Sequence, residues 1–203
     1  YNIKKIPALI LISKDIEKIG IDENIFFIEN NYAVFDKSVP YVDLSSGQIK
    51  GLVDLKEVSD SSCLDCASMS NLKKQFENTG VKIKDYEVVF SSSSEGKKLI
   101  DENKLSFLSS LLISKNINEY WWIFSQIKNL LIEKEDYYVF KNPSYPYKEI
   151  STGKVRGKTR ITYLTNNSCL DCFDVTQLKE AFQNLGIYIE SDILQADEFR
   201  DAQ

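Results

Sequence analysis

The sequence predicts an α/β protein built from two copies of one structural unit. The tetrapeptide Cys-Leu-Asp-Cys occurs twice, at 63–66 and 169–172, and the residues around it repeat without a gap at the same offset of 106 positions. Each motif lies between a stretch with apolar or β-branched residues at alternating positions and a stretch with a helical apolar stripe. Alternation of strands and helices is typical of the α/β class, and a unit of about 100 residues is the size of a small domain.

Each copy begins with a strand that leads into the cysteine motif. These first strands are predicted over 52–58 and 159–165. Small polar residues of the types that cap helices come next, so we expect each Cys-x-x-Cys motif to open a helix. Gly80 and Gly186 end the two helices, in the position where a positive φ is usual.

The unit continues with further strands and one short polar helix. Strands are expected over 81–90 and 187–194, the polar helix over 94–103, apolar strands over 8–12 and 109–113, and last strands over 32–35 and 137–140. The aromatic cluster Tyr120–Phe124 falls on an amphipathic helix that runs to Leu131, where packing into the core is expected. The order within one unit is therefore strand, helix, strand, helix, strand, strand.

The two copies are laid out differently along the chain. Residues 45–152 hold one contiguous copy with the first motif. The other copy is split, because its cysteine half lies in 153–203 whereas its closing half, which matches 110–140, lies in 1–44. We therefore predict a second unit assembled from the N- and C-terminal segments, either within one chain or in a segment-swapped oligomer. Because the chain begins with Tyr1 rather than Met, we also expect it to be a piece of a longer product.

Composition and charge exclude several classes of protein. Hydrophobic residues make up 43% of the chain and charged residues 27%, which excludes a disordered polymer. The net charge of −5, without any basic patch interleaved with aromatic residues, argues against a nucleic-acid partner. No apolar run approaches the roughly 20 residues that a membrane-spanning helix needs, so we expect no membrane span.

The absence of histidine narrows the chemistry further. Without imidazole, the chain has no Ser-His-Asp or Cys-His nucleophile, no histidine metal ligand and no imidazole general base. The four cysteines are the distinctive reactive groups that remain, and we expect no cofactor. All four lie in the two motifs, as suits a protein that must avoid wrong pairings in an oxidising space, which favours a secreted or cell-surface location.

The motifs and their surroundings resemble the thioredoxin-like superfamily. The residues that carry this resemblance are Cys63-Leu64-Asp65-Cys66 and Cys169-Leu170-Asp171-Cys172, each after a strand, and Lys5-Ile6-Pro7-Ala8-Leu9-Ile10-Leu11, which looks like the strand that the family enters through a cis-proline. The resemblance covers essentially the whole chain in two copies. It is greatest to tandem thiol-disulfide oxidoreductases of the protein disulfide isomerase type.

The resemblance implies a thioredoxin-like fold and a substrate-binding role for Ile6 and Pro7 beside a disulfide. Pro7 aligns with Leu108, so the contiguous unit is expected to lack the proline. The dipeptide Leu-Asp between the cysteines is neither the Gly-Pro of thioredoxins nor the Gly-His of disulfide isomerases. The redox potential and the direction of electron flow are therefore not implied.

The chemistry of thiols gives each cysteine an expected role. A thiolate rather than a thiol attacks a disulfide, and the N-terminus of a helix stabilises a thiolate, so Cys63 and Cys169 are the expected attackers. Cys66 and Cys172 lie close enough to resolve the mixed disulfide that forms. The carboxylates of the motif, Asp65 and Asp171, oppose the thiolate and are expected to raise the pKa of the attacking cysteine, which predicts moderate thiol acidity.

Two other interpretations of the motifs stay open. Four thiolates can hold one zinc or iron ion, but zinc knuckles are usually about 15–20 residues apart, whereas 102 residues separate Cys66 from Cys169, so we expect no metal. The pairs can also be short-loop disulfides in a redox-inactive interaction or spacer module. On the oxidoreductase hypothesis, the partners are protein thiols or disulfides and a second protein that recycles the motif.

Overall fold

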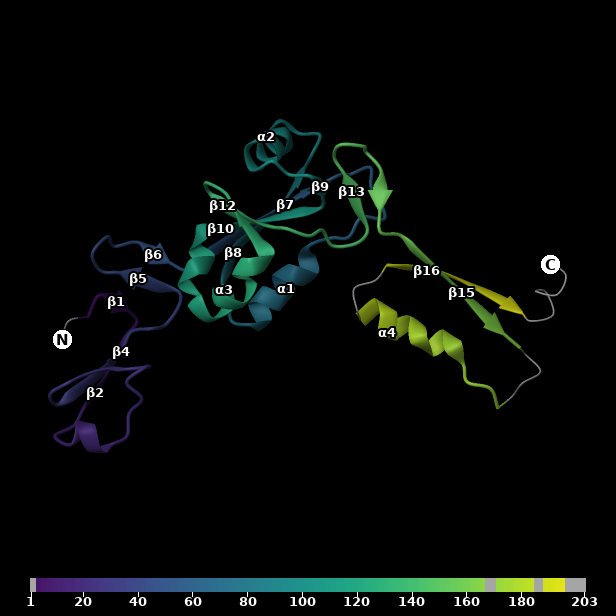
Figure 1. The fold of residues 1–203 in the computed structure, drawn as a ribbon. Coiled ribbons are helices and arrows are strands. Elements are labelled where there is room, and N and C mark those ends of the chain that lie inside the picture. The colour runs from purple at the N-terminus through teal and green to yellow at the C-terminus, as the bar shows by residue number, and fades with distance from the viewer. Residues whose placement is uncertain (1–2, 167–170, 185–187, 196–203) are drawn as a thin grey trace. The chain divides into compact units, whose positions relative to one another are not determined.

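A computed structural model describes residues 3–166, 171–184 and 188–195 (Figure 1). It is a mixed α/β structure, as the sequence predicts. The chain divides into two compact units, of which the first comprises 1–56, 70–87 and 112–139, and the second 57–69, 88–111 and 140–203.

The described residues form strands, α-helices and short 3₁₀-helices. The strands are β1 (Lys5–Ile6), β2 (Leu9–Ile12), β3 (Phe27–Glu29), β4 (Tyr32–Phe35), β5 (Tyr41–Asp43), β6 (Ile49–Lys50), β7 (Val53–Ser59), β8 (Ile83–Phe90), β9 (Phe107–Leu108), β10 (Ser110–Ser114), β11 (Leu131–Glu133), β12 (Tyr137–Phe140), β13 (Tyr147–Glu149), β14 (Val155–Arg156), β15 (Thr159–Thr165) and β16 (Ile189–Gln195). The helices are η1 (Ile16–Lys18), α1 (Ser70–Asn78), α2 (Ser94–Asn103), η2 (Lys115–Glu119), α3 (Trp121–Ile127), η3 (Lys128–Leu130), η4 (Val175–Gln177) and α4 (Leu178–Asn184).

The strands form five sheets. The largest has the order β11-β12-β10-β7-β8, and the others are β2-β4-β3, β1-β5-β6, β14-β13-β9 and β15-β16. Strands β10 and β12 pair antiparallel, whereas β15 and β16 pair parallel with Thr159 opposite Ile189 and Thr165 opposite Gln195. The elements β15, α4 and β16 follow one another along the chain in the same order as β7, α1 and β8.

The core of the first unit is centred on Tyr120, which is completely buried. Its hydroxyl donates a hydrogen bond to the carbonyl of Gly51 (2.8 Å) and accepts one from the backbone N–H of Lys82 (2.9 Å). Burial raises the pKa of this hydroxyl. Gly51 has φ +83°, and a Cβ at this position would lie 2.3 Å from the Val39 side chain, so only glycine fits.

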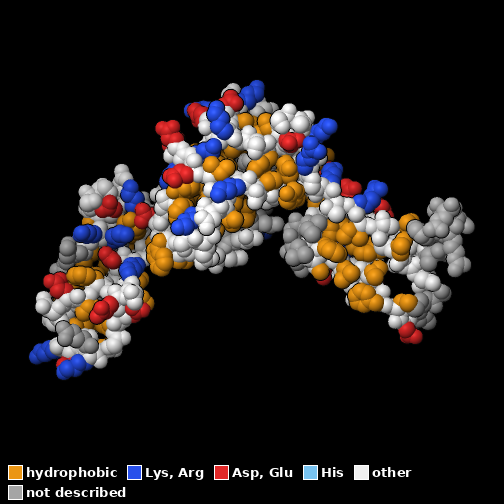
Figure 2. Space-filling model, in the orientation of Figure 1, with side chains coloured by type: hydrophobic (Ala, Val, Ile, Leu, Met, Phe, Trp, Pro, Cys, Tyr) orange, Lys and Arg blue, Asp and Glu red, His pale blue; other side chains and the backbone are white. Residues whose placement is uncertain are grey.

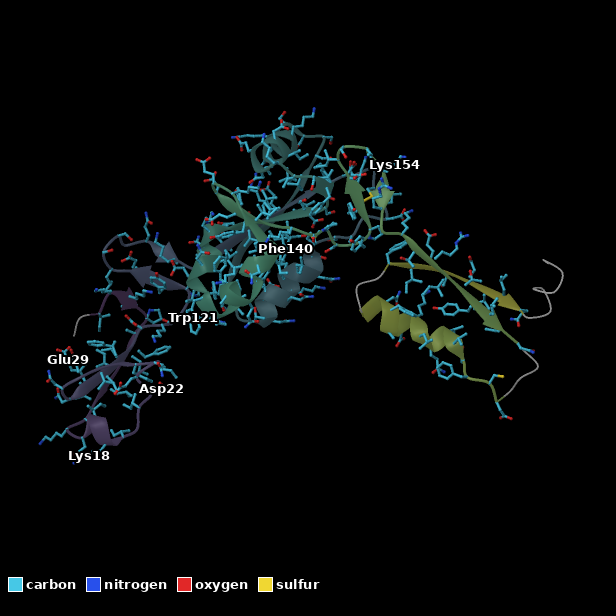
Figure 3. All side chains as sticks on the ribbon, in the orientation of Figure 1. Lys18, Asp22, Glu29, Trp121, Phe140 and Lys154 are labelled. Carbon is cyan, nitrogen blue, oxygen red and sulfur yellow. A yellow bond between two sulfur atoms is a disulfide. The ribbon has the colours of Figure 1, made fainter. Side chains whose placement is uncertain are left out.

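The aromatic cluster at the start of α3 is only partly in the core, which corrects one expectation. Tyr120 and Ile123 are buried, as predicted, but Trp121 is 66% exposed (Figure 3). The reason is that α3 packs inward with one face, which carries Ile123, whereas Trp121 lies on another face.

Tyr41 is a second buried tyrosine of the first unit. Its hydroxyl donates a hydrogen bond of 2.8 Å to the carboxylate of Glu119. Burial, together with this carboxylate, raises the pKa of Tyr41 to about 12. The contact holds β5 against the last residue of η2.

The second unit contains α2 and the chain around the first cysteine motif. Helix α2 begins at Ser94, because the Ser93 side chain accepts a hydrogen bond from the N–H of Gly96 (2.9 Å). It ends at Asn103, and Lys104 caps it with φ +52°. Among the helices that the structure describes, none is both long enough and apolar enough to cross a lipid bilayer.

Candidate active site

The first motif occupies a tight turn that follows β7. The Asp60 carboxylate accepts hydrogen bonds from the backbone N–H (2.8 Å) and hydroxyl (2.7 Å) of Ser62. The N–H of Cys63 then bonds to the carbonyl of Asp60 (3.0 Å), and the N–H of Cys66 bonds to the carbonyl of Cys63 (3.3 Å). These local bonds fix the backbone that presents the two cysteines.

Cys63 and Cys66 are joined by a disulfide, with their Cα atoms 5.4 Å apart. Both residues are half-buried. Leu64, between them, is 93% exposed. The disulfide therefore lies in a surface turn next to an exposed apolar side chain.

The first motif does not open a helix, which corrects the prediction. Helix α1 begins only at Ser70, because the chain after Cys66 is held by bonds to other elements. The N–H of Ala67 donates to the carbonyl of Pro146 (2.8 Å), and the N–H of Met69 donates to the carboxylate of Glu57 (3.1 Å), which is 2% exposed. The N-terminus of α1 is thus too far along the chain to stabilise a thiolate at the first cysteine.

Asp60 also anchors the turn to β13. Lys148 donates a hydrogen bond to the Asp60 carboxylate at 2.5 Å, and both side chains are at least three-quarters buried. This hydrogen bond, with those from Ser62, lowers the pKa of Asp60 to about 2. The carboxylate therefore keeps its negative charge through most of the acid range.

The carboxylate of Asp65, inside the motif, has a cationic partner. Lys158 forms an ion pair with it and lies 3.9 Å from Glu190. The hydrogen bond to Asp65 raises the pKa of Lys158. The hydroxyl of Tyr188 is 3.5 Å from Asp65. Burial and, to a smaller extent, the nearby carboxylates raise the pKa of Tyr188. Because the ammonium group offsets the carboxylate, the like-charge effect of Asp65 on a thiolate is smaller than the sequence alone suggests.

A pocket of about 330 Å³ adjoins the motif on this side. Asp65, Ala67, Tyr145, Pro146 and Tyr188 are among the residues that line it. It offers a mixed polar and aromatic surface one residue from Cys66. Such a surface suits a side chain of a bound polypeptide.

The second motif is described only in part. Cys172 is disulfide-bonded and exposed, while Cys169 lies outside the described residues, as does Gly186. Cys172, Thr165 and Leu164 line a pocket of about 720 Å³. The prediction that this motif opens a helix directly is also wrong, because Asp174 caps η4 instead, with its carboxylate 2.9 Å from the N–H of Thr176, and α4 follows.

The predicted substrate-binding residues, Ile6 and Pro7, belong to the first unit, whereas both motifs belong to the second. Ile6 is 42% exposed and ends β1, and the carbonyl of Pro7 accepts a hydrogen bond from the Ser38 hydroxyl (2.9 Å). The Ile6–Pro7 and Leu108–Ser109 peptide bonds are both cis. The described contacts assign Pro7 to neither motif, so its substrate-binding role remains a prediction.

The strand register changes the alignment of Pro7. Tyr32 of β4 lies opposite Ile12, and its sequence equivalent Tyr137 of β12 lies opposite Ser114. The apolar strands of the two copies therefore correspond at an offset of 102 positions. The sequence similarity alone aligns Pro7 with Leu108, which is an offset of 101 positions. At this offset Pro7 corresponds to Ser109 and not to Leu108.

Three residues near the first motif were missed by the sequence analysis. Glu57 had a usable signal, because it is a charged residue at an inward-facing position of a strand whose other inward residues, Val53 and Leu55, are fully buried. Lys148 and Lys158 had none, since nothing in the sequence links them to the motif. Within the described residues, no group of acidic, histidine or cysteine side chains is gathered as a metal site.

No protein-family model matches the chain, and the comparisons with curated proteins and with solved structures gave no match.

Proposed function

We propose that this protein is a thiol-disulfide oxidoreductase or isomerase that acts on protein substrates through its Cys-x-x-Cys motifs. The observation that carries the proposal is the position of Cys63 and Cys66, which pair with each other in a surface turn beside the 93% exposed Leu64. A disulfide so placed is open to attack by the thiolate of a bound polypeptide.

The exchange reaction takes place in two balanced steps. A client thiolate attacks one sulfur of the Cys63–Cys66 bond, so that a mixed disulfide forms as the original bond breaks, and the other cysteine leaves as a thiolate that takes a proton from water. A second thiolate of the client then attacks the mixed disulfide. The client loses two electrons to the motif, which becomes a dithiol, and the reverse sequence reduces a client disulfide.

In the reducing direction the two cysteines have distinct roles. Cys63 attacks the client and Cys66 resolves the mixed disulfide, because the two residues between them let the second thiol reach it. Cys169 and Cys172 take the same roles in the second motif. A separate redox protein is needed to return the motifs to their starting state.

Two features support the thioredoxin-like fold that this function implies. In the contiguous copy β7, α1, β8, α2, β10 and β12 follow one another as strand, helix, strand, helix, strand, strand, with the short strands β9 and β11 and the helix α3 in addition. Its cysteines follow the first of these strands. We propose the thioredoxin-like fold for both copies on the same grounds.

The test measures exchange at each motif separately. The double variant Cys63→Ser/Cys66→Ser retains only the second motif, and Cys169→Ser/Cys172→Ser retains only the first. Each is equilibrated with a series of reduced and oxidised glutathione mixtures and its thiols are quantified after acid quenching. Exchange within minutes in at least one variant is expected, with the quadruple serine variant as the control.

A redox-inactive interaction or spacer module is the second candidate, and one observation favours it for the first motif. Helix α1 begins four residues after Cys66, so the helix dipole does not activate the attacking thiol. If neither motif exchanges within minutes, while both double variants remain folded by circular dichroism, the oxidoreductase proposal is wrong and the module is the better description.

A further inference from the structure

Tyr145 is an exposed aromatic residue that is held in place near the first motif. It is 52% exposed, yet two contacts fix its ring. The ring packs edge to face against Tyr147, with the ring centroids 5.5 Å apart. It also lies against Gly157, where a Cβ would come within 2.1 Å of a ring atom of Tyr145. An aromatic side chain that is already ordered loses little conformational entropy when it binds a partner.

The chain next to Tyr145 is joined to the motif. The N–H of Ala67 donates to the carbonyl of Pro146 (2.8 Å). The residues on both sides of Cys66, which are Asp65 and Ala67, line the pocket of about 330 Å³ together with Tyr145. Ligand pockets have volumes of about 300–1,000 Å³, so this one is at the small end of the range. It has room for one large side chain directly beside the disulfide.

The charges at the pocket favour an uncharged occupant. Among the described residues that line it, Asp65 is the only ionised one, and Lys158 pairs with it. Lys158 directly follows Gly157, so one short stretch both positions the Tyr145 ring and compensates the carboxylate. A carboxylate in the pocket would be repelled by Asp65, and an ammonium group would have to displace Lys158. The amide of Gln183, also in the lining, can form a hydrogen bond with an uncharged polar group.

We propose that this pocket binds a tyrosine side chain of a client polypeptide, two residues from the client cysteine that reacts with the first motif. In an extended chain, side chains two residues apart point to the same side and are about 6.5 Å apart. A cysteine over the disulfide therefore brings the second side chain to the neighbouring pocket. Tyrosine fits because its ring packs against Tyr145 while its hydroxyl meets the polar part of the lining.

This role rests on the proposed function, because a client cysteine reacts only if the motif exchanges. The client thiolate forms a bond to one sulfur of the Cys63–Cys66 disulfide as that bond breaks, and the other cysteine leaves as a thiolate that takes a proton from water. A tyrosine in the pocket makes this step faster by holding the client thiolate beside the disulfide.

The first test compares peptides on a protein that retains only the first motif, Cys169→Ser/Cys172→Ser. The probes are acetyl-Gly-X-Gly-Cys-Gly-X-Gly-amide peptides in which X is tyrosine, leucine or alanine, so that either chain direction is covered. The rate at which each peptide reduces the Cys63–Cys66 disulfide is divided by its rate with oxidised glutathione, which removes differences in intrinsic thiol reactivity. The tyrosine peptide is expected to react about tenfold faster than the alanine peptide. Equal rates within about twofold, or a leucine peptide as fast as the tyrosine peptide, would overturn the proposal.

The second test removes the aromatic wall of the pocket. Tyr145→Ser in the same background is expected to bring the ratio of the tyrosine to the alanine rate close to one. Phe90→Ser is the matched control, because Phe90 is 48% exposed in the same unit but is not part of the lining. The control is needed because hydrophobic side chains also gather at the surface over β15, α4 and β16 (Figure 2). Circular dichroism checks the folding of both variants, and Tyr145→Leu replaces Tyr145→Ser if the serine variant is unfolded. A ratio unchanged by the loss of Tyr145 would refute the pocket.

A third measurement separates this proposal from the proposed function. The same peptides with serine in place of cysteine carry a dye, and their binding is followed by fluorescence anisotropy. About tenfold tighter binding of the tyrosine peptide than of the alanine peptide, lost in Tyr145→Ser, is expected even if no thiol exchanges with the motif. Exchange with glutathione but no preference among the peptides would remove the pocket alone. Preferential binding without any exchange would remove the oxidoreductase function and leave the pocket as a peptide-binding site.

Discussion

The bonds around Asp60 predict a stability contribution that disappears in acid. In the folded protein, the hydrogen bond from Lys148 and those from Ser62 lower the pKa of Asp60 from its ordinary value of 3.8 to about 2. Because one pKa unit corresponds to about 1.4 kcal/mol, ionised Asp60 stabilises the folded state by about 2 kcal/mol at neutral pH. The two side chains are 16% and 25% exposed, so solvent screens this contribution only weakly.

The sign of the pH dependence follows from the direction of the shift. A carboxylate whose pKa is lowered on folding contributes its full stabilisation above the unfolded pKa, and that stabilisation is lost as the pH falls through the folded pKa. The free energy of unfolding of the wild type should therefore exceed that of Asp60→Asn by about 2 kcal/mol at pH 6. The difference should shrink steadily below about pH 4 and be mostly gone near pH 2.

The assay is urea unfolding followed by circular dichroism at a series of pH values between 6 and 2. Asp101→Asn is the matched control, since it removes an exposed carboxylate of α2 in the same unit. Its difference from the wild type should stay within about 0.5 kcal/mol at every pH. A difference between the wild type and Asp60→Asn that is equal at pH 6 and pH 2 would refute the assignment of the stabilisation to an ionised carboxylate.

Two further predictions concern other buried or charged contacts. Tyr120→Phe leaves the carbonyl of Gly51 and the N–H of Lys82 without their partner, so the free energy of unfolding in urea should fall by about 2 kcal/mol. A fall of less than about 0.5 kcal/mol would contradict the role of the hydroxyl. Lys158→Met leaves the Asp65 charge uncompensated, and this charge opposes the thiolate. The reduced cysteines of the first motif should therefore be alkylated about two- to five-fold more slowly at pH 7. The control, Lys154→Met, should not change this rate.

Local sequence signals predicted the longer elements, but not short strands such as β1, β5, β9 and β13. The strands β4, β12 and β15 and the helix α2 have the predicted bounds. Continuous apolar and aromatic runs define β4 and β12, and β-branched or apolar residues at alternating positions define β15. The Ser93 cap defines the start of the helix, so nothing distant in the chain is needed to specify these elements. The thioredoxin-like arrangement and the pairing of 1–44 with 153–203 stay predictions.

Contacts between distant residues decided what the sequence could not predict. The start of α1 is set by the hydrogen bond from Ala67 to Pro146 and by that from Met69 to Glu57, and neither partner can be read from the capping pattern around the motif. The equivalence of Pro7 with Ser109 depends on which residues lie opposite each other in paired strands. A one-residue shift of this kind leaves the sequence similarity almost unchanged but moves a side chain to the other face of a sheet.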